Sequence, residues 1–329
     1  MPAKWFSEKG ASLAPLKNKK IAVLGFGSQG SAQALNLRDS GLDVIVGVRK
    51  GKSWNRAKGE GFDVFDVATA TRKADVVLVL LPDEEQPHVY AREIAPNLKR
   101  GSALVFAHGM NIVFGTIKPR ADVDIVLCTS IGPGKTLREN FVKGGGLMGL
   151  IAVEQDVSGS AHGVALALAK GIGLARVGVL ETTLRHETVC DLFGEQAVLC
   201  GGIAGTMKDA FETLTKRGYP AELAYLFCVQ GAASVCALIE KHGIEGMYER
   251  VSNTAEFGSR FFGESAREKD KGLGKLLHNI ESGKFVREWE KEHAKGMRAL
   301  GKARGTGKGA VLEKTGSVVR SRLNQKDLK

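Results

Sequence analysis

The sequence of 329 residues predicts an α/β protein in which a doubly wound parallel sheet is followed by an all-helical domain. Three observations support this fold class. A strand, a glycine-rich turn and a helix follow one another over residues 19–38. Short apolar runs then alternate with helical segments up to about residue 180, and the remainder has helical periodicity with few strand-like runs. We place the boundary where the periodicity changes, which predicts domains over residues 1–181 and 182–329.

The first apolar run, Ile21–Leu24, is directly followed by GFGSQG and then by a helix with apolar residues at helical spacing. This order is typical of the Rossmann dinucleotide-binding fold. Its glycines permit a tight turn and a close approach to pyrophosphate, while the N–H groups of the helix point at phosphate. An ordinary strand-to-helix turn is the alternative. The predicted nucleotide-binding residues of this loop are Gly25, Phe26, Gly27, Ser28, Gln29 and Gly30.

A basic segment follows the second predicted strand, Asp43–Val48. In NAD-binding folds this strand usually ends in an acidic residue that binds the ribose 2′-hydroxyl, whereas cations stand here. Cations suit a 2′-phosphate, so NADP(H) is favoured and NAD(H) is the competing cofactor. A basic surface turn is the structural alternative. The residues concerned are Arg49, Lys50, Lys52 and Ser53.

Further apolar runs complete the predicted sheet. The run Asp75–Leu81 is continuous, as expected for a parallel strand that is covered on both faces. In the C-terminal part, Asp191–Leu199 and Ala221–Glu240 have the pattern of long amphipathic helices. The remaining predicted strands are Ser102–Phe106, Asp124–Cys128, Leu147–Val153 and Val177–Leu180.

Composition argues against nucleic acid and membrane partners. The formal net charge is +11, but residues 301–329 hold eight Lys or Arg against two acidic residues, a net +6, without an aromatic residue that could stack on a base. A solvated basic terminus explains this charge. The chain has no run of 18 uncharged apolar residues and no apolar signal segment, so we expect a cytoplasmic protein.

Three segments could hold reaction chemistry. His108 follows a predicted strand, at the sheet edge where ligands bind in such folds, although a structural hydrogen bond is an equal alternative. The turn 130–135 contains Gly134, which allows a ligand close to the backbone or serves the turn alone. Asp191 and Glu195 share one face of a predicted helix, where two carboxylates suit Mg²⁺, although a solvated helix face is the simpler alternative.

With these segments in place, the chain resembles the ketol-acid reductoisomerase family, in its shorter form with a single knotted helical domain. The similarity extends over nearly the whole chain. The motifs that match are GFGSQG, NLRDSG, LLPDE, EIAPNLKRG, FAHGMNI, DLFGEQAVLCGG and SNTAEFG.

The resemblance implies a mechanism and assigns roles to residues. Members of the family bind NADPH and two Mg²⁺ ions, move an alkyl group within an acetohydroxy acid, and then reduce the resulting 2-keto group. Helices of a partner subunit complete the site, which implies a homodimer or a higher homo-oligomer. By matching position, Asp191 and Glu195 are catalytic metal ligands, His108 is an active-site histidine that also contacts cofactor, Ser252 contacts the substrate carboxylate, and Pro82 of LLPDE contacts cofactor.

The chain departs from the family at three charged positions. Two glutamates of the family align with Phe227 and Gly231, and a lysine aligns with Ile131. A divalent ion needs anionic oxygen ligands to leave water, so we expect one well-held Mg²⁺ and a weakened second site. Loss of the lysine removes a cation that could face an oxyanion.

These departures indicate a substrate pocket rebuilt around Ile131, Phe227 and Gly231. We expect hydride transfer at C2 coupled to C–C bond formation on a small 2,3-dioxygenated acid. The family members that this resembles most close a cyclopropanol from a sulfonium acid in specialised bacterial metabolism. Two alternatives stay open: an authentic ketol-acid reductoisomerase that acts on 2-acetolactate in valine and isoleucine synthesis, and a non-catalytic nucleotide-binding homologue.

Overall fold

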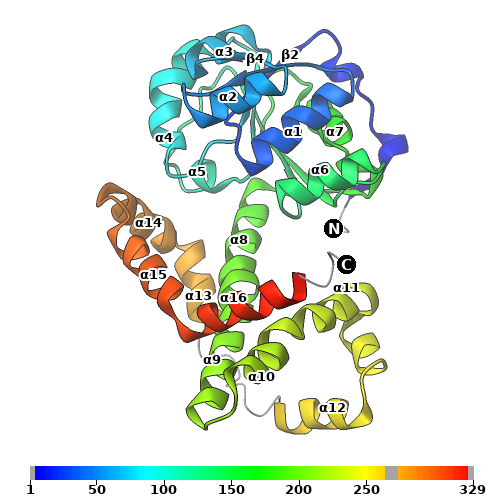
Figure 1. Ribbon diagram of the computed structural model, residues 1–329. Helices are drawn as coiled ribbons and strands as arrows, with labels where there is room; N and C mark the ends of the chain where they lie inside the picture. Colours follow the sequence, from blue (N-terminus) through cyan, green and yellow to red (C-terminus); the bar gives the residue numbers. More distant parts are fainter. Residues whose placement is uncertain (1–3, 264–272, 325–329) are drawn as a thin grey trace. The chain divides into compact units, whose positions relative to one another are not determined.

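The computed structural model describes residues 4–263 and 273–324. The chain forms two compact units, Met1–Cys190 and Asp191–Lys329 (Figure 1). The boundary between them lies inside helix α8, Leu184–Gly194, so that this helix begins in the first unit and ends in the second. The boundary predicted after residue 181 comes just before this helix.

The first unit is built on a nine-stranded sheet of the described residues, in the order β1-β9-β8-β7-β6-β5-β2-β3-β4. Strand β2 pairs in parallel with β3 on one side and with β5 on the other, and β6 and β7 extend the parallel part. The loops that follow β2, β3, β5, β6 and β7 therefore all leave the same edge of the sheet. The strands are β1 (Trp5–Phe6), β2 (Lys20–Leu24), β3 (Asp43–Gly47), β4 (Asp63–Phe65), β5 (Val76–Val79), β6 (Ala103–Phe106), β7 (Asp124–Ser130), β8 (Gly149–Gln155) and β9 (Val179–Glu181).

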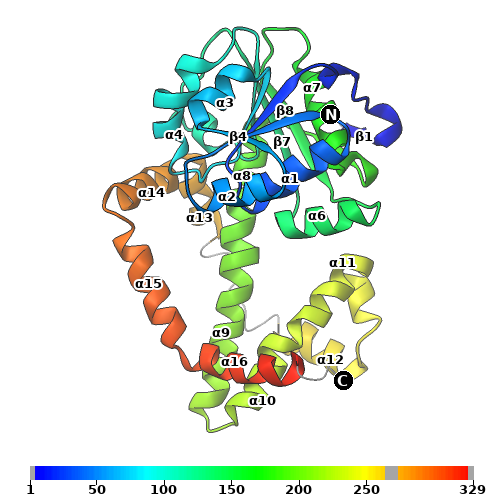
Figure 2. The ribbon, with the colours of Figure 1, turned by 45° about the horizontal axis from the view of Figure 1, so that its top comes forward.

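Alternate residues of β2 point to two separate apolar cores, one on each face of the sheet. Ile21 and Val23 belong to the core that includes α1, α6 and α7, whereas Ala22 and Leu24 belong to the core that includes α3. Figure 2 shows α1 and α6 side by side. The helices of this unit are α1 (Ser28–Asp39), α2 (Lys52–Gly59), α3 (Val67–Lys73), α4 (Gln86–Val89), α5 (Met110–Val113), α6 (Gly134–Val142) and α7 (Ala161–Ile172).

Two strand pairs differ from the expected parallel arrangement, and two strands were not predicted. β7 and β8 are antiparallel, as are β1 and β9. An apolar run such as Leu147–Val153 looks alike in either direction, so periodicity alone does not reveal strand orientation. Strands β1 and β4 are two and three residues long, which is too short to give a recognisable apolar run.

The second unit is helical, as predicted, but its long helices are interrupted by wider π-helical turns. The predicted helix Asp191–Leu199 spans the end of α8 and a π-helical segment, Glu195–Ile203. A Cβ at Gly201 would lie 2.0 Å from the carbonyl oxygen of Gln196, so glycine permits this turn. The other helices are α9 (Ala204–Lys216), α10 (Ala221–Tyr225), α11 (Ala232–Tyr248), α12 (Asn253–Gly258), α13 (Leu273–Glu281), α14 (Lys284–Ala294), α15 (Arg298–Gly309) and α16 (Val311–Asn324).

The helical stretch Ala221–Tyr248, which is kinked at Gly243 (φ +74°), is unusually apolar for a surface segment. Its mean hydropathy reaches 1.7, and only 11% of its most apolar window is buried within the chain. By length and composition alone such a helix could cross a membrane. The same properties also fit a soluble helix whose apolar surface is covered by another polypeptide.

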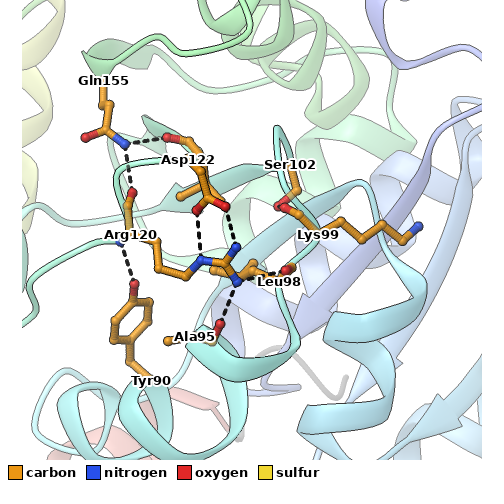
Figure 3. A network of polar contacts seen from close by, with 9 residues as sticks. Tyr90, Ala95, Leu98, Lys99, Ser102, Arg120, Asp122 and Gln155 are labelled. Atoms are coloured by element: carbon orange, nitrogen blue, oxygen red, sulfur yellow. Dashed lines mark hydrogen bonds and ion pairs between the residues drawn. The ribbon is translucent and has the colours of Figure 1, made fainter.

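Arg120 connects the segment that follows α4 to the residues just before β7 (Figure 3). Its Nη1 donates to the carbonyl oxygens of Ala95 and Leu98, both at 2.9 Å. Its Nε and Nη2 donate to the two carboxylate oxygens of Asp122, at 2.8 and 2.6 Å, and this contact lowers the pKa of Asp122. The backbone N–H of Arg120 donates to the hydroxyl of Tyr90.

We expect Arg120→Ala to lower the free energy of unfolding by about 2 kcal/mol, because two partly buried carbonyl groups lose their charged donor. Urea denaturation followed by circular dichroism measures this. The control is Arg72→Ala, which removes a guanidinium that, among the residues the structure describes, hydrogen-bonds at the surface to the side chain of Asn97 alone, and it should cost less than about 0.5 kcal/mol. Equal losses in both variants would contradict a bridging role for Arg120.

Candidate functional site

The glycine loop after β2 has two positions that require glycine for packing and one that leaves open space. A Cβ at Gly25, whose φ is +101°, would lie 2.4 Å from the carbonyl oxygen of Leu80. A Cβ at Gly30 would lie 2.2 Å from the carbonyl oxygen of Gly25, whereas at Gly27 nothing lies within 4 Å. Gly27 stands just before the first turn of α1, and the N-terminus of a helix is where this fold class binds a phosphate.

Gln29 of this loop hydrogen-bonds to the turn after β7. Its Nε2 donates to the carbonyl oxygen of Gly132 at 3.0 Å. A Cβ at Gly134 would lie 2.2 Å from the carbonyl oxygen of Ser28, so glycine is needed where α6 begins against α1. Ile131, between these contacts, is 54% exposed. The predicted cofactor residue Gly134 and the predicted substrate residue Ile131 thus lie in a turn that is held directly against the nucleotide loop.

The basic segment leaves the same edge of the sheet after β3. Arg49 and Lys50 are exposed, and α2 begins at Lys52 with Ser53 in its first turn. Their charges lie on the loop that follows the strand next to β2, which is where the adenosine ribose binds in this fold class. These predicted residues are therefore in a position to meet a 2′-phosphate.

Two more turns at this edge are joined by amide side chains. Asn111 Nδ2 donates to the carbonyl oxygen of Asp83 at 2.9 Å and to Gln86 Oε1 at 3.0 Å. Gln86 Nε2 in turn donates to the carbonyl oxygen of Leu81. The turn after β5, which presents Pro82 at the surface, and the turn after β6 are consequently one connected structure.

His108 is held by Glu187, a residue that no sequence motif singles out. Glu187 Oε1 lies 3.2 Å from His108 Nδ1, and the carboxylate side chain is only 4% exposed. Its Oε2 accepts from the N–H of Gly109 at 3.3 Å and from the Thr188 hydroxyl at 3.2 Å. A carboxylate at Nδ1 favours the tautomer with its proton on that nitrogen. Glu187 was missed because it precedes the predicted helix Asp191–Leu199 and a lone glutamate carries no motif.

Asp191 lies one helical turn beyond Glu187 on α8. Ligand atoms of His108, Glu187 and Asp191 all lie within 4.8 Å of one another, which is a suitable donor set for a divalent cation. Glu195, the predicted partner of Asp191, is exposed at the start of the π-helical segment and is not part of this group. The structure therefore adds Glu187 and His108 to the predicted carboxylates as candidate ligands.

The other predicted residues lie on separate elements of the second unit. Ser252 caps α12, and its hydroxyl accepts from the N–H of Ala255 at 3.2 Å. Phe227 lies in the π-helical segment Leu226–Gln230 and is 75% exposed. Gly231 joins that segment to α11, with its N–H bonded to the carbonyl oxygen of Leu226.

Comparison with known families assigns both parts of the chain. A family described as "Acetohydroxy acid isomeroreductase, NADPH-binding domain" matches residues 15–178, and one described as "Ketol-acid reductoisomerase, C-terminal domain" matches residues 184–325. The chain belongs to the ketol-acid reductoisomerase family. This membership confirms the predicted fold, a Rossmann-like domain followed by a helical one.

Individual ketol-acid reductoisomerases are similar over their full length. The chain is 47% identical to "Ketol-acid reductoisomerase (NADP(+))" of Pyrobaculum aerophilum and 46% identical to that of Leuconostoc mesenteroides, covering 98% of this chain and 99% and 94% of those proteins. The structure of an "NADH-preferring ketol-acid reductoisomerase from an uncultured archean" is 40% identical, with a TM-score of 0.94 over 97% of this chain and 98% of that one.

Asp83 is a further carboxyl group near His108 and Glu187, and burial raises its pKa because desolvation penalises the charged form. When the pKa of an acid is higher in the folded than in the unfolded protein, the acid stabilises the fold at a pH below the unfolded-state pKa. This stabilisation is lost as the pH rises through the folded-state pKa. We therefore expect Asp83→Asn to gain stability relative to the unsubstituted protein as the pH rises over the range above about 4, the ordinary pKa of an aspartate. Urea denaturation across that range measures the difference, and a difference that does not change with pH would contradict it.

Proposed function

We propose that the protein is an NADP(H)- and Mg²⁺-dependent ketol-acid reductoisomerase that acts on an acetohydroxy acid such as 2-acetolactate. The observation that supports this most is full-length similarity to reductoisomerases together with an intact glycine loop and the group of His108, Glu187 and Asp191. The named relatives favour this function over the specialised chemistry expected from the three departures, and nothing in them indicates a cyclopropanol-forming member.

NADP(H) is the proposed cofactor. Two relatives are named for NADP(+), and the exposed cations after β3 suit a 2′-phosphate. A structural relative is named as preferring NADH, so NAD(H) is the competitor that a binding experiment must include.

Mg²⁺ is the proposed metal, held by Asp191 with Glu187 or Glu195. When bound, it would polarise neighbouring oxygens of a keto or hydroxy acid. The protein's own part is to fix His108 through Glu187, so that the ring can hold or pass a proton at Nε2. Ser252 is the proposed contact for the substrate carboxylate.

A second candidate function rests on the apolar residues that stand where the chain departs from the family's charged residues. Phe227 and Ile131 are 75% and 54% exposed, and each stands where the family has a charged residue, so a substrate bound by either side chain would meet an apolar surface. This candidate is an enzyme that couples hydride transfer at C2 with C–C bond formation on a 2,3-dioxygenated acid, closing a cyclopropanol from a sulfonium acid.

We also propose that the protein is a homodimer or a higher homo-oligomer. The apolar stretch Ala221–Tyr248 is largely uncovered within one chain, and a second copy would remove its surface from water. Sedimentation equilibrium would reveal a monomer if this proposal were wrong.

Three substrates distinguish the candidate functions. An authentic reductoisomerase consumes NADPH with 2-acetolactate and also with 3-hydroxy-3-methyl-2-ketobutyrate, the acid in which the alkyl group has already moved. The second candidate predicts little oxidation of NADPH with 2-acetolactate. It predicts release of dialkyl sulfide from a 2,3-dihydroxy-5-sulfonio acid when NADP+ is supplied, because NADP+ takes the hydride from C2, C3 then displaces the sulfide from C5, and the hydride returns to C2. Absorbance at the nicotinamide band and gas chromatography of the sulfide measure these outcomes. Inactivity with all three acids, despite bound nucleotide, would favour the non-catalytic homologue.

We expect Asp191→Asn to raise the Mg²⁺ concentration for half-maximal activity at least about tenfold, since a neutral amide is a weaker ligand than a carboxylate. Binding of Mn²⁺ followed by electron paramagnetic resonance gives a second readout. Asp209→Asn, which changes an exposed carboxylate of α9, is the charge-matched control. Parallel measurements on Glu187→Gln and Glu195→Gln identify the second carboxylate ligand. Equal Mg²⁺ dependence of the Asp191 and Asp209 variants would exclude Asp191 as a metal ligand.

A further inference from the structure

Arg56 reaches from α2 to the nucleotide loop. Its Nη2 donates to the carbonyl oxygen of Phe26 and, at 3.4 Å, to that of Gly27. Its guanidinium carbon lies 5.2 Å from the centroid of the Phe26 ring. Three contacts with two consecutive residues hold the end of an otherwise exposed side chain against the loop before α1.

The charge of Arg56 is not balanced by an acidic group. Within the residues that the structure describes, no carboxylate pairs with it, and its Nε and Nη1 make no hydrogen bond to protein. The positive end of the α1 dipole and the exposed Arg49, Lys50 and Lys52 add further positive potential at this edge. Several like charges held together favour binding of an anion there.

Arg56 also shares a helix face with two predicted ligands of the 2′-phosphate. Lys52 and Ser53 precede it by four and three residues on α2, and residues at these spacings are neighbours on a helix surface. Arg56 therefore lies between the loop that faces pyrophosphate and the segment that faces the adenosine ribose.

We propose that Arg56 determines preference for the 2′-phosphorylated nucleotide. This inference rests on the proposed dinucleotide function. The pyrophosphate already has the N–H groups of α1 and the open space at Gly27, whereas a 2′-phosphate needs charged donors beyond the end of β3. A guanidinium is a strong charged donor to phosphate, and Nη2 is steadied by the loop carbonyls, so that Nε or Nη1 can donate to a phosphate oxygen.

The test is calorimetric titration of the full-length protein with NADPH and with NADH. We expect Arg56→Ala to weaken NADPH binding about tenfold, which is ~1.4 kcal/mol, and NADH binding by less than about twofold. Arg56→Lys keeps the charge without the planar fork and should lie between. Lys58→Ala is the matched control, because Lys58 is a cation of the same helix that contacts the Trp54 ring and not the loop; it should leave the NADPH-to-NADH ratio unchanged.

The outcomes distinguish this inference from the function on which it rests. Equal weakening of both nucleotides would overturn it and place Arg56 at the pyrophosphate. An unchanged ratio, or one matched by Lys58→Ala, would also overturn it. If the unsubstituted protein binds neither nucleotide, the proposed dinucleotide function itself is wrong. Should Arg56→Ala fail to fold, Arg56→Gln and Arg56→Lys provide the same comparison of the two nucleotides.

Discussion

The arrangement of this protein's nucleotide-binding edge depends on backbone atoms that approach one another more closely than any side chain allows. Carbonyl oxygens lie 2.4, 2.2 and 2.2 Å from the places where Cβ atoms would stand at Gly25, Gly30 and Gly134. These three contacts bring β2, the turn after β5, α1 and α6 together. Because the N-terminus of α1 is fixed by them, its N–H groups face the open space at Gly27 in a defined direction.

Around this rigid centre the loops that leave this edge of the sheet carry different ionisable groups. The loop after β3 and the start of α2 provide cations for a nucleotide, while the turns after β5 and β6 bring Asp83 and His108 near Glu187. A dinucleotide needs the first environment and a divalent cation needs the second. A parallel sheet supplies both, since all of these strands end at one edge and each loop can vary independently.

Much of this architecture was predictable, and the failures have physical causes. Apolar runs located β2, β3, β5, β6 and β7, and GFGSQG located the nucleotide loop, because these signals are local. The antiparallel direction of β8 was not predictable, since an apolar run has no direction. Glu187 was overlooked because its importance comes from His108, 79 residues earlier in the chain. The π-helical turn at Glu195 was missed because its first residues have ordinary helical periodicity.

The sequence by itself therefore determined the fold class, the nucleotide loop and the family, since each follows from residue types at short spacing. Only the tertiary structure decided which side chains meet. It joined His108 to Glu187, fastened the turn of Ile131 to the nucleotide loop through Gln29, and brought Arg56 against Phe26. Such contacts depend on strand order and helix packing over long sequence separations, and no local pattern encodes that information.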